Sequence, residues 1–274
     1  MKFFLLILFV FLSSCGKEKI EYEPTKKINP YKIYNEAYEA FADNDFFYAS
    51  KKFSEAELNF QEPIFSAKSA IMSAYSLYGI NFYNEALESL NNYFINYPAD
   101  KNIIYAHYLE AIIYFEQIGD EKYDLAPLLK AEKKINFFLK KYPNSEYSID
   151  LKFKKNLVEN QFAAKELFVA KYYIKVQKWI PAINRLKVIV DKYDKTIFIE
   201  EALHRLVEIH FHLGLEEEAR KYASVLGYNY NSSEWFKQSY KILNKNYKKL
   251  PVTSTNQKEE KKILRKIIDK IKIK

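Results

Sequence analysis

Residues 86–98 read Ala-Leu-Glu-Ser-Leu-Asn-Asn-Tyr-Phe-Ile-Asn-Tyr-Pro, and the way this stretch recurs along the chain decides the fold class. Leu90 and Tyr93 follow the first alanine by four and seven positions, so all three residues lie on one face of a helix. An aromatic residue and a proline, Tyr97 and Pro98, close the stretch. The stretch therefore predicts one amphipathic helix that packs along its apolar face.

The same pattern occurs five times in the chain. Each copy has an alanine, two packing residues four and seven positions later, and an aromatic residue eleven positions later. Five copies in one register indicate an internal repeat in which every alanine opens a packed helix. The alanines are Ala49, Ala86, Ala131, Ala182 and Ala219, and their aromatic partners are Phe60, Tyr97, Tyr142, Tyr193 and Tyr230.

A second helix precedes each of these helices in the predicted unit. Three of the alanines have another alanine twelve positions upstream, at Ala37, Ala74 and Ala170. Such small residues allow a preceding helix to approach closely, so the unit is a helical hairpin. Glycines fall between the two helices of three hairpins, where we expect left-handed turn residues. These glycines are Gly79, Gly119 and Gly214.

The offsets within this hairpin resemble those of the tetratricopeptide repeat, whose period is 34 residues. The alanines here are spaced more widely, which predicts a long turn at residues 120–125 and a lengthened helix between Ser145 and Gln177. We therefore expect an all-α fold, an α–α superhelix of about five tetratricopeptide-like hairpins over residues 31–248, with a closing helix starting near Ser233. The first helix of each hairpin then lines a concave surface.

Composition supports a packed helical protein and argues against several classes of function. The 274 residues are 49% hydrophobic and include only 5 Gly and 8 Pro, too few turn formers for a many-stranded β-sandwich or barrel. Cys15 is the only cysteine, which excludes an internal disulfide and a thiolate metal cluster. The sequence has no Gly-rich phosphate loop and no nucleophile elbow. We therefore expect neither an enzyme nor a cofactor.

Residues 1–14 predict a lipoprotein signal peptide. The apolar run from Phe3 to Leu12 is about half the length needed to span a membrane, and residues 12–16 resemble a bacterial lipobox in which Cys15 is acylated after cleavage. Acyl chains hold a protein on a bilayer, and Gly16 in place of aspartate favours sorting to the outer membrane. Residues 15–30 are interpreted as a lipidated tether. The alternative is an ordinary secretory signal with an incidental cysteine.

The predicted concave surface is rich in aromatic residues over the first three hairpins. Tyrosine offers contact area and a hydrogen-bonding tip, which suits an extended peptide with apolar or aromatic side chains. The alternative is that some of these rings pack between hairpins. The predicted peptide groove consists of Tyr31, Tyr34, Tyr38, Phe41, Tyr75, Tyr78, Tyr105 and Tyr108.

His204, Glu208 and His212 are spaced four residues apart and would lie on one helix face. The outer two stand about 12 Å apart along a helix, so only two of the three can reach one ion comfortably. We interpret them as a solvated polar face, with a hidden metal enzyme as the alternative.

Residues 249–274 predict a linker and a basic amphipathic tail. From residue 258 onward the chain has eight Lys or Arg and three acidic residues, which accounts for most of its net charge of +8. Apolar residues recur every three to four positions there. The tail either binds an anionic leaflet or an acidic partner, or is a solvated extension. Nucleic acid is not an expected partner, because no aromatic residue interleaves with these charges.

Together, the lipobox, the repeats and several strings of residues resemble the BamD family, lipoproteins of the outer-membrane β-barrel assembly machinery. The resemblance covers residues 15–247, although Asp194 and Asn231 replace the expected prolines. The strings are Tyr97-Pro98, Tyr105-Ala106-His107-Tyr108, Tyr142-Pro143-Asn144-Ser145-Glu146-Tyr147, Val169-Ala170-Lys171-Tyr172-Tyr173, Ala182-Ile183-Asn184-Arg185, Leu213-Gly214 and Asn231-Ser232-Ser233-Glu234-Trp235.

The resemblance implies a scaffold on the periplasmic face of the outer membrane. Its N-terminal repeats would receive unfolded outer-membrane proteins, whose aromatic-rich final strand suits the predicted groove. Its C-terminal repeats would bind the periplasmic domains of BamA, with Tyr172, Tyr173 and Arg185 as the contact residues, and other Bam lipoproteins are further candidate partners. The alternative is a division-coordinating repeat protein of the CpoB or YbgF type, which normally lacks a lipobox and has an N-terminal coiled coil.

Overall fold

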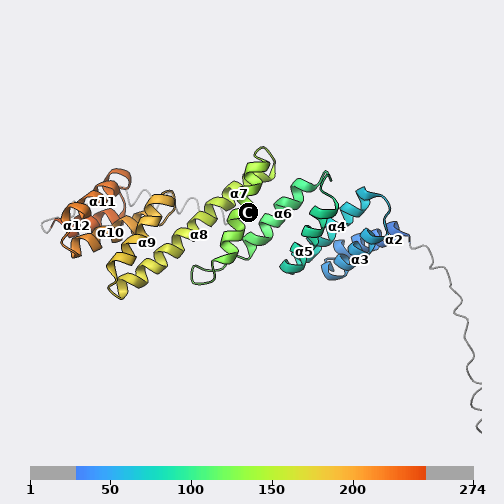
Figure 1. The fold of residues 1–274 in the computed structure, drawn as a ribbon, viewed down its shortest axis with the longest axis horizontal. Coiled ribbons are helices and arrows are strands. Elements are labelled where there is room, and N and C mark those ends of the chain that lie inside the picture. The colour runs from blue at the N-terminus through green and yellow to red at the C-terminus, as the bar shows by residue number, and fades with distance from the viewer. Residues whose placement is uncertain (1–28, 245–274) are drawn as a thin grey trace, which may run out of the picture. The chain divides into compact units, whose positions relative to one another are not determined.

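The computed structural model of the protein describes residues 29–244. Over that range the chain forms eleven α-helices and no strand (Figure 1). The prediction of an all-α fold is confirmed. The helices, labelled as in Figure 1, are α2 (Pro30–Ala42), α3 (Phe46–Asn59), α4 (Pro63–Gly79), α5 (Tyr83–Asn96), α6 (Ile103–Glu116), α7 (Ala126–Lys141), α8 (Tyr147–Lys175), α9 (Trp179–Lys192), α10 (Ile199–His212), α11 (Glu216–Asn229) and α12 (Glu234–Leu243).

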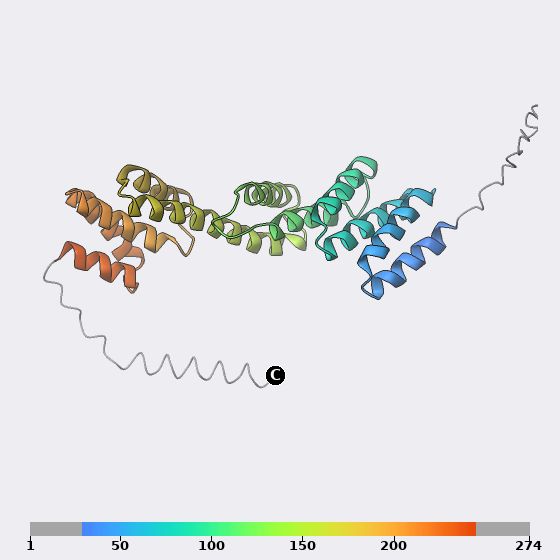
Figure 2. The same ribbon diagram turned by 90° about the horizontal axis from the view of Figure 1, so that it is seen from below.

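The described residues form two compact units, one ending at Ile113 and the other beginning at Tyr114. In the first unit, α2 packs against α3, α3 against α4 and α4 against α5, and the first part of α6 completes the core around α5. In the second unit, α8 packs between α7 and α9, and α12 packs against both α10 and α11. Figure 2 shows the helices of each unit doubling back on one another as hairpins.

The alanines of the repeat pattern form the tightest part of both cores. In the first hairpin, Ala37 of α2 and Ala49 of α3 pack with Phe53, and all three are completely buried. Small side chains at these crossings let the backbones of two helices approach closely. The predicted role of the alanines is confirmed, because all eight have no exposed surface: Ala37, Ala49, Ala74, Ala86, Ala131, Ala170, Ala182 and Ala219.

The aromatic residue eleven positions after each alanine ends its helix. In every copy this residue is the C-cap, and its backbone N–H donates to the carbonyl four residues earlier, as from Tyr97 to Tyr93. The caps are Phe60 of α3, Tyr97 of α5, Tyr142 of α7, Tyr193 of α9 and Tyr230 of α11.

The turn residues differ from the prediction at two of three glycines. Gly214 is left-handed, with φ of 75°, as expected. Gly79 is instead the last residue of α4, and Gly119 does not have positive φ. Three other hairpins have a left-handed residue that is not glycine, at Asn44, Asn81 and Gln177. Asparagine tolerates this conformation because its short polar side chain can hydrogen-bond locally, so glycine is not required.

The two predicted departures from the regular repeat are confirmed. The helix α8 has 29 residues, whereas most of its neighbours have 14. The long connection between α6 and α7 is held against α8, because Gln161 Nε2 donates to the carbonyl of Gly119 over 2.9 Å and Lys165 Nζ to that of Tyr123 over 2.8 Å.

The closing helix also begins where the sequence predicts. Ser233 is the N-cap of α12, and its hydroxyl oxygen accepts a hydrogen bond of 3.1 Å from the backbone N–H of Phe236. A serine in this position satisfies one of the free N–H groups of the first helical turn.

The signal peptide, Cys15, the tether up to residue 28 and the basic tail lie outside the described residues, so the structure does not test the predictions for them. None of the helices in residues 29–244 combines the length and the apolar character that crossing a bilayer requires.

Candidate functional site

Five of the predicted groove residues form a connected series of rings on the first helices of three successive hairpins. We call this series the aromatic ladder: Phe41 of α2, Tyr75 and Tyr78 of α4, and Tyr105 and Tyr108 of α6. The ring centroids of Phe41 and Tyr75 are 5.8 Å apart, and those of Tyr75 and Tyr105 are 6.5 Å apart. Tyr78 and Tyr108 extend the series at 6.0 and 6.2 Å. The ladder therefore crosses the first unit from α2 to α6.

The position of the ladder follows from the alanines beside it. Ala37, Ala74 and Ala106 are completely buried and fix which face of each first helix points into the core. Tyr75 and Tyr105 are adjacent to such an alanine, so their rings lie at the edge of the buried face, and all five ladder rings are half-buried. The ladder thus combines fixed packing with surface that remains accessible.

The other three predicted groove residues do not join the ladder directly. Tyr31 packs edge-on against Phe60 at 5.0 Å and Phe65 at 5.3 Å, at the start of the first unit. Tyr34 packs against the completely buried Phe53 at 5.3 Å, so its ring contacts the second helix of its own hairpin. Tyr38 is 56% exposed and makes none of these ring contacts.

The structure brings the residues predicted for the partner surface together in the second unit. Tyr173 and Arg185 line one pocket of about 280 Å³ with Pro181, Asn184 and Val188. Tyr172 is 59% exposed, and its ring is 5.7 Å from that of Tyr173. We call Tyr172, Tyr173 and Arg185 the α8–α9 face. Arg185 also pairs with Glu166, with Nη1 and Oε2 3.1 Å apart.

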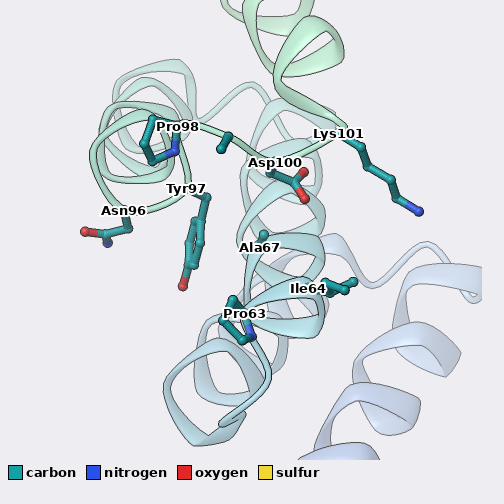
Figure 3. Close-up of a pocket in the computed structure, with 9 residues that line it drawn as sticks. Pro63, Ile64, Ala67, Asn96, Tyr97, Pro98, Asp100 and Lys101 are labelled. Atoms are coloured by element: carbon teal, nitrogen blue, oxygen red, sulfur yellow. The ribbon is translucent and has the colours of Figure 1, made fainter.

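Sequence reasoning missed a larger pocket of about 440 Å³ in the first unit (Figure 3). It lies where the first turn of α4 meets the loop between α5 and α6, and the Tyr97 ring points from the end of α5 toward Pro63. The Tyr97-Pro98 pair by itself indicates only a helix end. The lining residues of the pocket are Pro63, Ile64, Ala67, Asn96, Tyr97, Pro98, Ala99, Asp100 and Lys101.

Two tyrosine hydroxyls donate hydrogen bonds that fix lining residues of this pocket. Tyr93 donates to the Asp100 carboxylate over 2.6 Å, and Tyr97 donates to Glu57 over 3.1 Å. Burial, reinforced by Glu57, raises the pKa of Tyr97 to about 12. Burial together with the Asp100 carboxylate raises the pKa of Tyr93 as well. Both hydroxyls therefore remain protonated donors well above neutral pH.

The stripe of His204, Glu208 and His212 is a solvated face only in part, because His212 is exposed and Glu208 partly exposed, whereas the interpretation was wrong for His204. His204 is 1% exposed, and its Nδ1 lies 2.8 Å from the hydroxyl oxygen of Ser239 on α12. The sequence pattern of α10 alone could not show this, because the covering helix lies 35 residues further along. His212 lies beside Trp179, with ring centroids 4.9 Å apart. Burial opposes ionisation of Glu208, but hydrogen bonds from His204 and Arg205 outweigh it and lower the pKa of Glu208 to about 2.

Comparison with known proteins extends these observations. The family model described as YfiO, outer membrane lipoprotein, matches residues 26–226. A relative from Rickettsia prowazekii, named "Outer membrane protein assembly factor BamD", is 33% identical over 89% of this chain and 96% of its own length. A relative of the same name from Caulobacter vibrioides is 34% identical over 80% of this chain and 72% of its own. A thermophilic TPR protein of Thermus thermophilus aligns over 78% of this chain and 99% of its own, with a TM-score of 0.35 and 15% identity.

The fold places the chain in the class of all-helical proteins built from consecutive helical hairpins, with buried alanines where the helices of a hairpin pack. The chain belongs to the YfiO family of outer membrane lipoproteins, whose curated relatives carry the name BamD. These matches do not favour the division-coordinating alternative.

Proposed function

We propose that the chain is an assembly factor for outer-membrane proteins, a lipid-anchored scaffold that binds other polypeptides and catalyses no reaction. The relatives named as assembly factors support the general role, since the similarity extends over most of both chains. The lipobox supports the anchor at Cys15 and a location on the periplasmic face of the outer membrane.

The aromatic ladder is the proposed site for unfolded β-barrel proteins, and its continuity across three helices is the observation that carries this proposal. Neighbouring ladder rings are 5.8 to 6.5 Å apart. Side chains on one face of an extended strand repeat about every 6.6 Å. An extended segment with an aromatic residue at every second position can therefore place its successive rings against successive rings of the aromatic ladder.

Tyrosine suits such a site better than a purely aliphatic surface. Aromatic pairs in edge-on or tilted arrangements add about 0.5–1.5 kcal/mol beyond the area that they bury. Four of the five ladder residues also carry a hydroxyl that can hydrogen-bond the backbone of an extended chain. The ladder would thus accept many sequences that share a strand pattern, as a general assembly factor requires.

The α8–α9 face is the proposed contact with the periplasmic domains of BamA. Its exposed ring, Tyr172, is next to Tyr173, which lines a pocket together with Arg185. Tyrosine and arginine are among the residue types that contribute most often to the binding energy of protein interfaces. Other Bam lipoproteins remain candidate partners for the remaining surface of the second unit.

Two binding assays on the same set of variants test both parts of the proposal. The first measures the affinity of a peptide with the aromatic C-terminal strand of an outer-membrane barrel. We expect Tyr75→Ala/Tyr105→Ala to weaken this affinity by about tenfold or more, which corresponds to about 1.4 kcal/mol. Tyr228→Ala is the matched control, because this tyrosine is 89% exposed on α11 in the other unit. Circular dichroism and the thermal midpoint confirm that each variant is folded.

The second assay asks whether BamA is recovered with the chain from detergent-solubilised membranes. We expect Tyr172→Ala/Arg185→Ala to reduce recovery of BamA and to leave peptide affinity unchanged, and the ladder variant to do the reverse. Unchanged peptide affinity in a folded ladder variant would reject the ladder as the substrate site. Failure of the wild-type chain to recover BamA would reject the assembly role.

A further inference from the structure

The outward face of α7 has a charge pattern that none of the functions above uses. The inner face of this helix buries Leu128, Ala131, Ile135 and Phe138. Its outer face, which we call the basic face of α7, carries four exposed lysines and two exposed apolar side chains. These residues are Leu129, Lys130, Lys133, Phe137, Lys140 and Lys141.

The lysines of this face are not balanced by carboxylates. Within residues 29–244, none of the four forms an ion pair with an acidic side chain. Glu132 is the only acidic residue of α7, and it is half-buried on another side of the helix. By contrast, α11 begins with three glutamates, and α5 contains two glutamates and no lysine. The positive face is therefore a local feature of α7.

Two large apolar side chains stand among these lysines. Leu129 is 48% exposed and Phe137 is 42% exposed, and the two are eight residues apart on the same side of the helix. Lys141 Nζ lies 5.3 Å from the centroid of the Phe137 ring, so a cation and an aromatic ring are adjacent at the surface. Exposed leucine and phenylalanine interleaved with lysine are typical of helices that lie in a membrane interface.

We propose that the basic face of α7 lies on an anionic phospholipid surface. The four lysines contact phosphate groups, and Leu129 and Phe137 enter the boundary between headgroups and acyl chains. The face is the outer side of a single helix, and the pockets described above do not lie on it, so its shape suits a plane better than an inserted peptide. A lipid anchor would hold this face near the bilayer and raise its effective concentration there. Only the location of the contact, and not its chemistry, rests on the proposed function.

The first experiment compares how strongly two charge variants of the full chain bind vesicles. Both variants also carry Cys15→Ser, which removes acylation. The probe is a vesicle of phosphatidylcholine with phosphatidylglycerol, compared with phosphatidylcholine alone. Lys130→Gln/Lys133→Gln/Lys140→Gln/Lys141→Gln removes the basic face. Lys178→Gln/Lys187→Gln/Lys192→Gln/Lys195→Gln removes the same charge from exposed lysines in and around α9. The basic tail is present in both variants, so only the difference between them is interpreted.

We expect the α7 variant to bind anionic vesicles about tenfold more weakly than the control variant, with the gap closing as salt is raised. Equal losses in the two variants would show general charge attraction and would overturn the proposal. If the α7 variant binds vesicles normally but loses BamA in the pull-down, the face contacts an acidic protein, and the lipid proposal is wrong.

A second experiment tests the apolar part of the contact. With Cys15 changed to serine, Leu129→Cys gives a single attachment point for an environment-sensitive fluorophore, because the chain has no other cysteine. We expect a blue shift of its emission on anionic vesicles and none on phosphatidylcholine. Ile180→Cys is the control, since Ile180 is 73% exposed on α9. No shift at residue 129, or an equal shift at 180, would overturn the proposal. The ladder variant should bind vesicles normally, so failure of the ladder proposal is recognised separately.

Discussion

His204 Nδ1 of α10 lies 2.8 Å from Ser239 Oγ of α12, and both side chains are completely or almost completely buried. Ser239 is the only buried residue of α12. Around this contact, the Trp235 ring lies 5.1 Å from the His204 ring and 5.5 Å from the Arg205 guanidinium. This buried polar contact, shielded by tryptophan and arginine, therefore adds to the apolar packing of Trp235, Phe236 and Leu243 that holds the closing helix against α10 and α11.

We predict that Ser239→Ala destabilises the second unit by about 1–3 kcal/mol, because it leaves a buried imidazole nitrogen without its partner. The measurement is urea unfolding followed by tryptophan fluorescence. Ser232→Ala is the control, since Ser232 is exposed and close in sequence. Equal midpoints for the two variants would mean that the His204 contact contributes little to the docking of α12.

We predict that Ala182→Leu lowers the free energy of unfolding by about 1–3 kcal/mol, because the crossing of α8 and α9 has no room for a larger side chain. Ala182 is completely buried, whereas Ala126 at the start of α7 is exposed. Ala126→Leu should therefore change stability little. Thermal and urea unfolding of the two variants give the comparison, and similar values for both would contradict the close-packing role of the repeat alanines.

We predict opposite effects for two substitutions at left-handed turn positions. Gly214 has φ of 75°, and an added Cβ would meet no atom within 4 Å, so Gly214→Ala tests backbone strain alone. It should cost about 1 kcal/mol. Gln177 has φ of 55°, so Gln177→Gly relieves a similar strain and should raise the unfolding midpoint. A loss of stability in Gln177→Gly would show that its side chain matters more than its backbone conformation.

We predict a loss of stability between about pH 10 and pH 12 that depends on Tyr97. The pKa of this hydroxyl is raised from 10 to about 12 in the folded state, so the folded protein holds the proton more tightly than the unfolded chain. Its contribution is complete below about pH 10 and disappears as the pH rises through 12. Tyr97→Phe should reduce the loss of stability across this window, with the remainder due to other buried tyrosines such as Tyr93, and Tyr228→Phe should leave it unchanged. Unfolding midpoints across the window provide the measurement.

Much of the fold could be predicted from the sequence, because the repeat depends on patterns of residues that are close together in the chain. Ala86 marks a buried helix crossing, Tyr97 marks a helix end and Ser233 marks a helix start, and each rests on residues within about one helix length. The identity of the left-handed residues was less predictable, because asparagine and glutamine fill positions that glycine also accepts. Asn81, two residues after Gly79, is an example.

The candidate site was predictable only in part, since it depends on how separate hairpins meet. The sequence placed Phe41 and Tyr75 on one surface, and the structure joins them, but it could not show that the Tyr34 ring turns toward Phe53. The pocket beside Tyr97 was missed because its walls come from residues 63–67 and 96–101. No local pattern in the chain links these two segments.

The length of α8 restricts how this family can vary. Near its start, the Ser148 hydroxyl donates to the carbonyl of Tyr142, the C-cap of α7, whereas Ala163 and Ala170 pack with residues of α9. The single helix α8 therefore sets the angle between α7 and α9, which contact it at points far apart along its length. Each inserted residue would turn the second neighbour by about 100° relative to the first. Insertions or deletions within α8 should thus survive only in near-whole turns, such as about seven or eleven residues, and length variation should gather in the connection between α6 and α7.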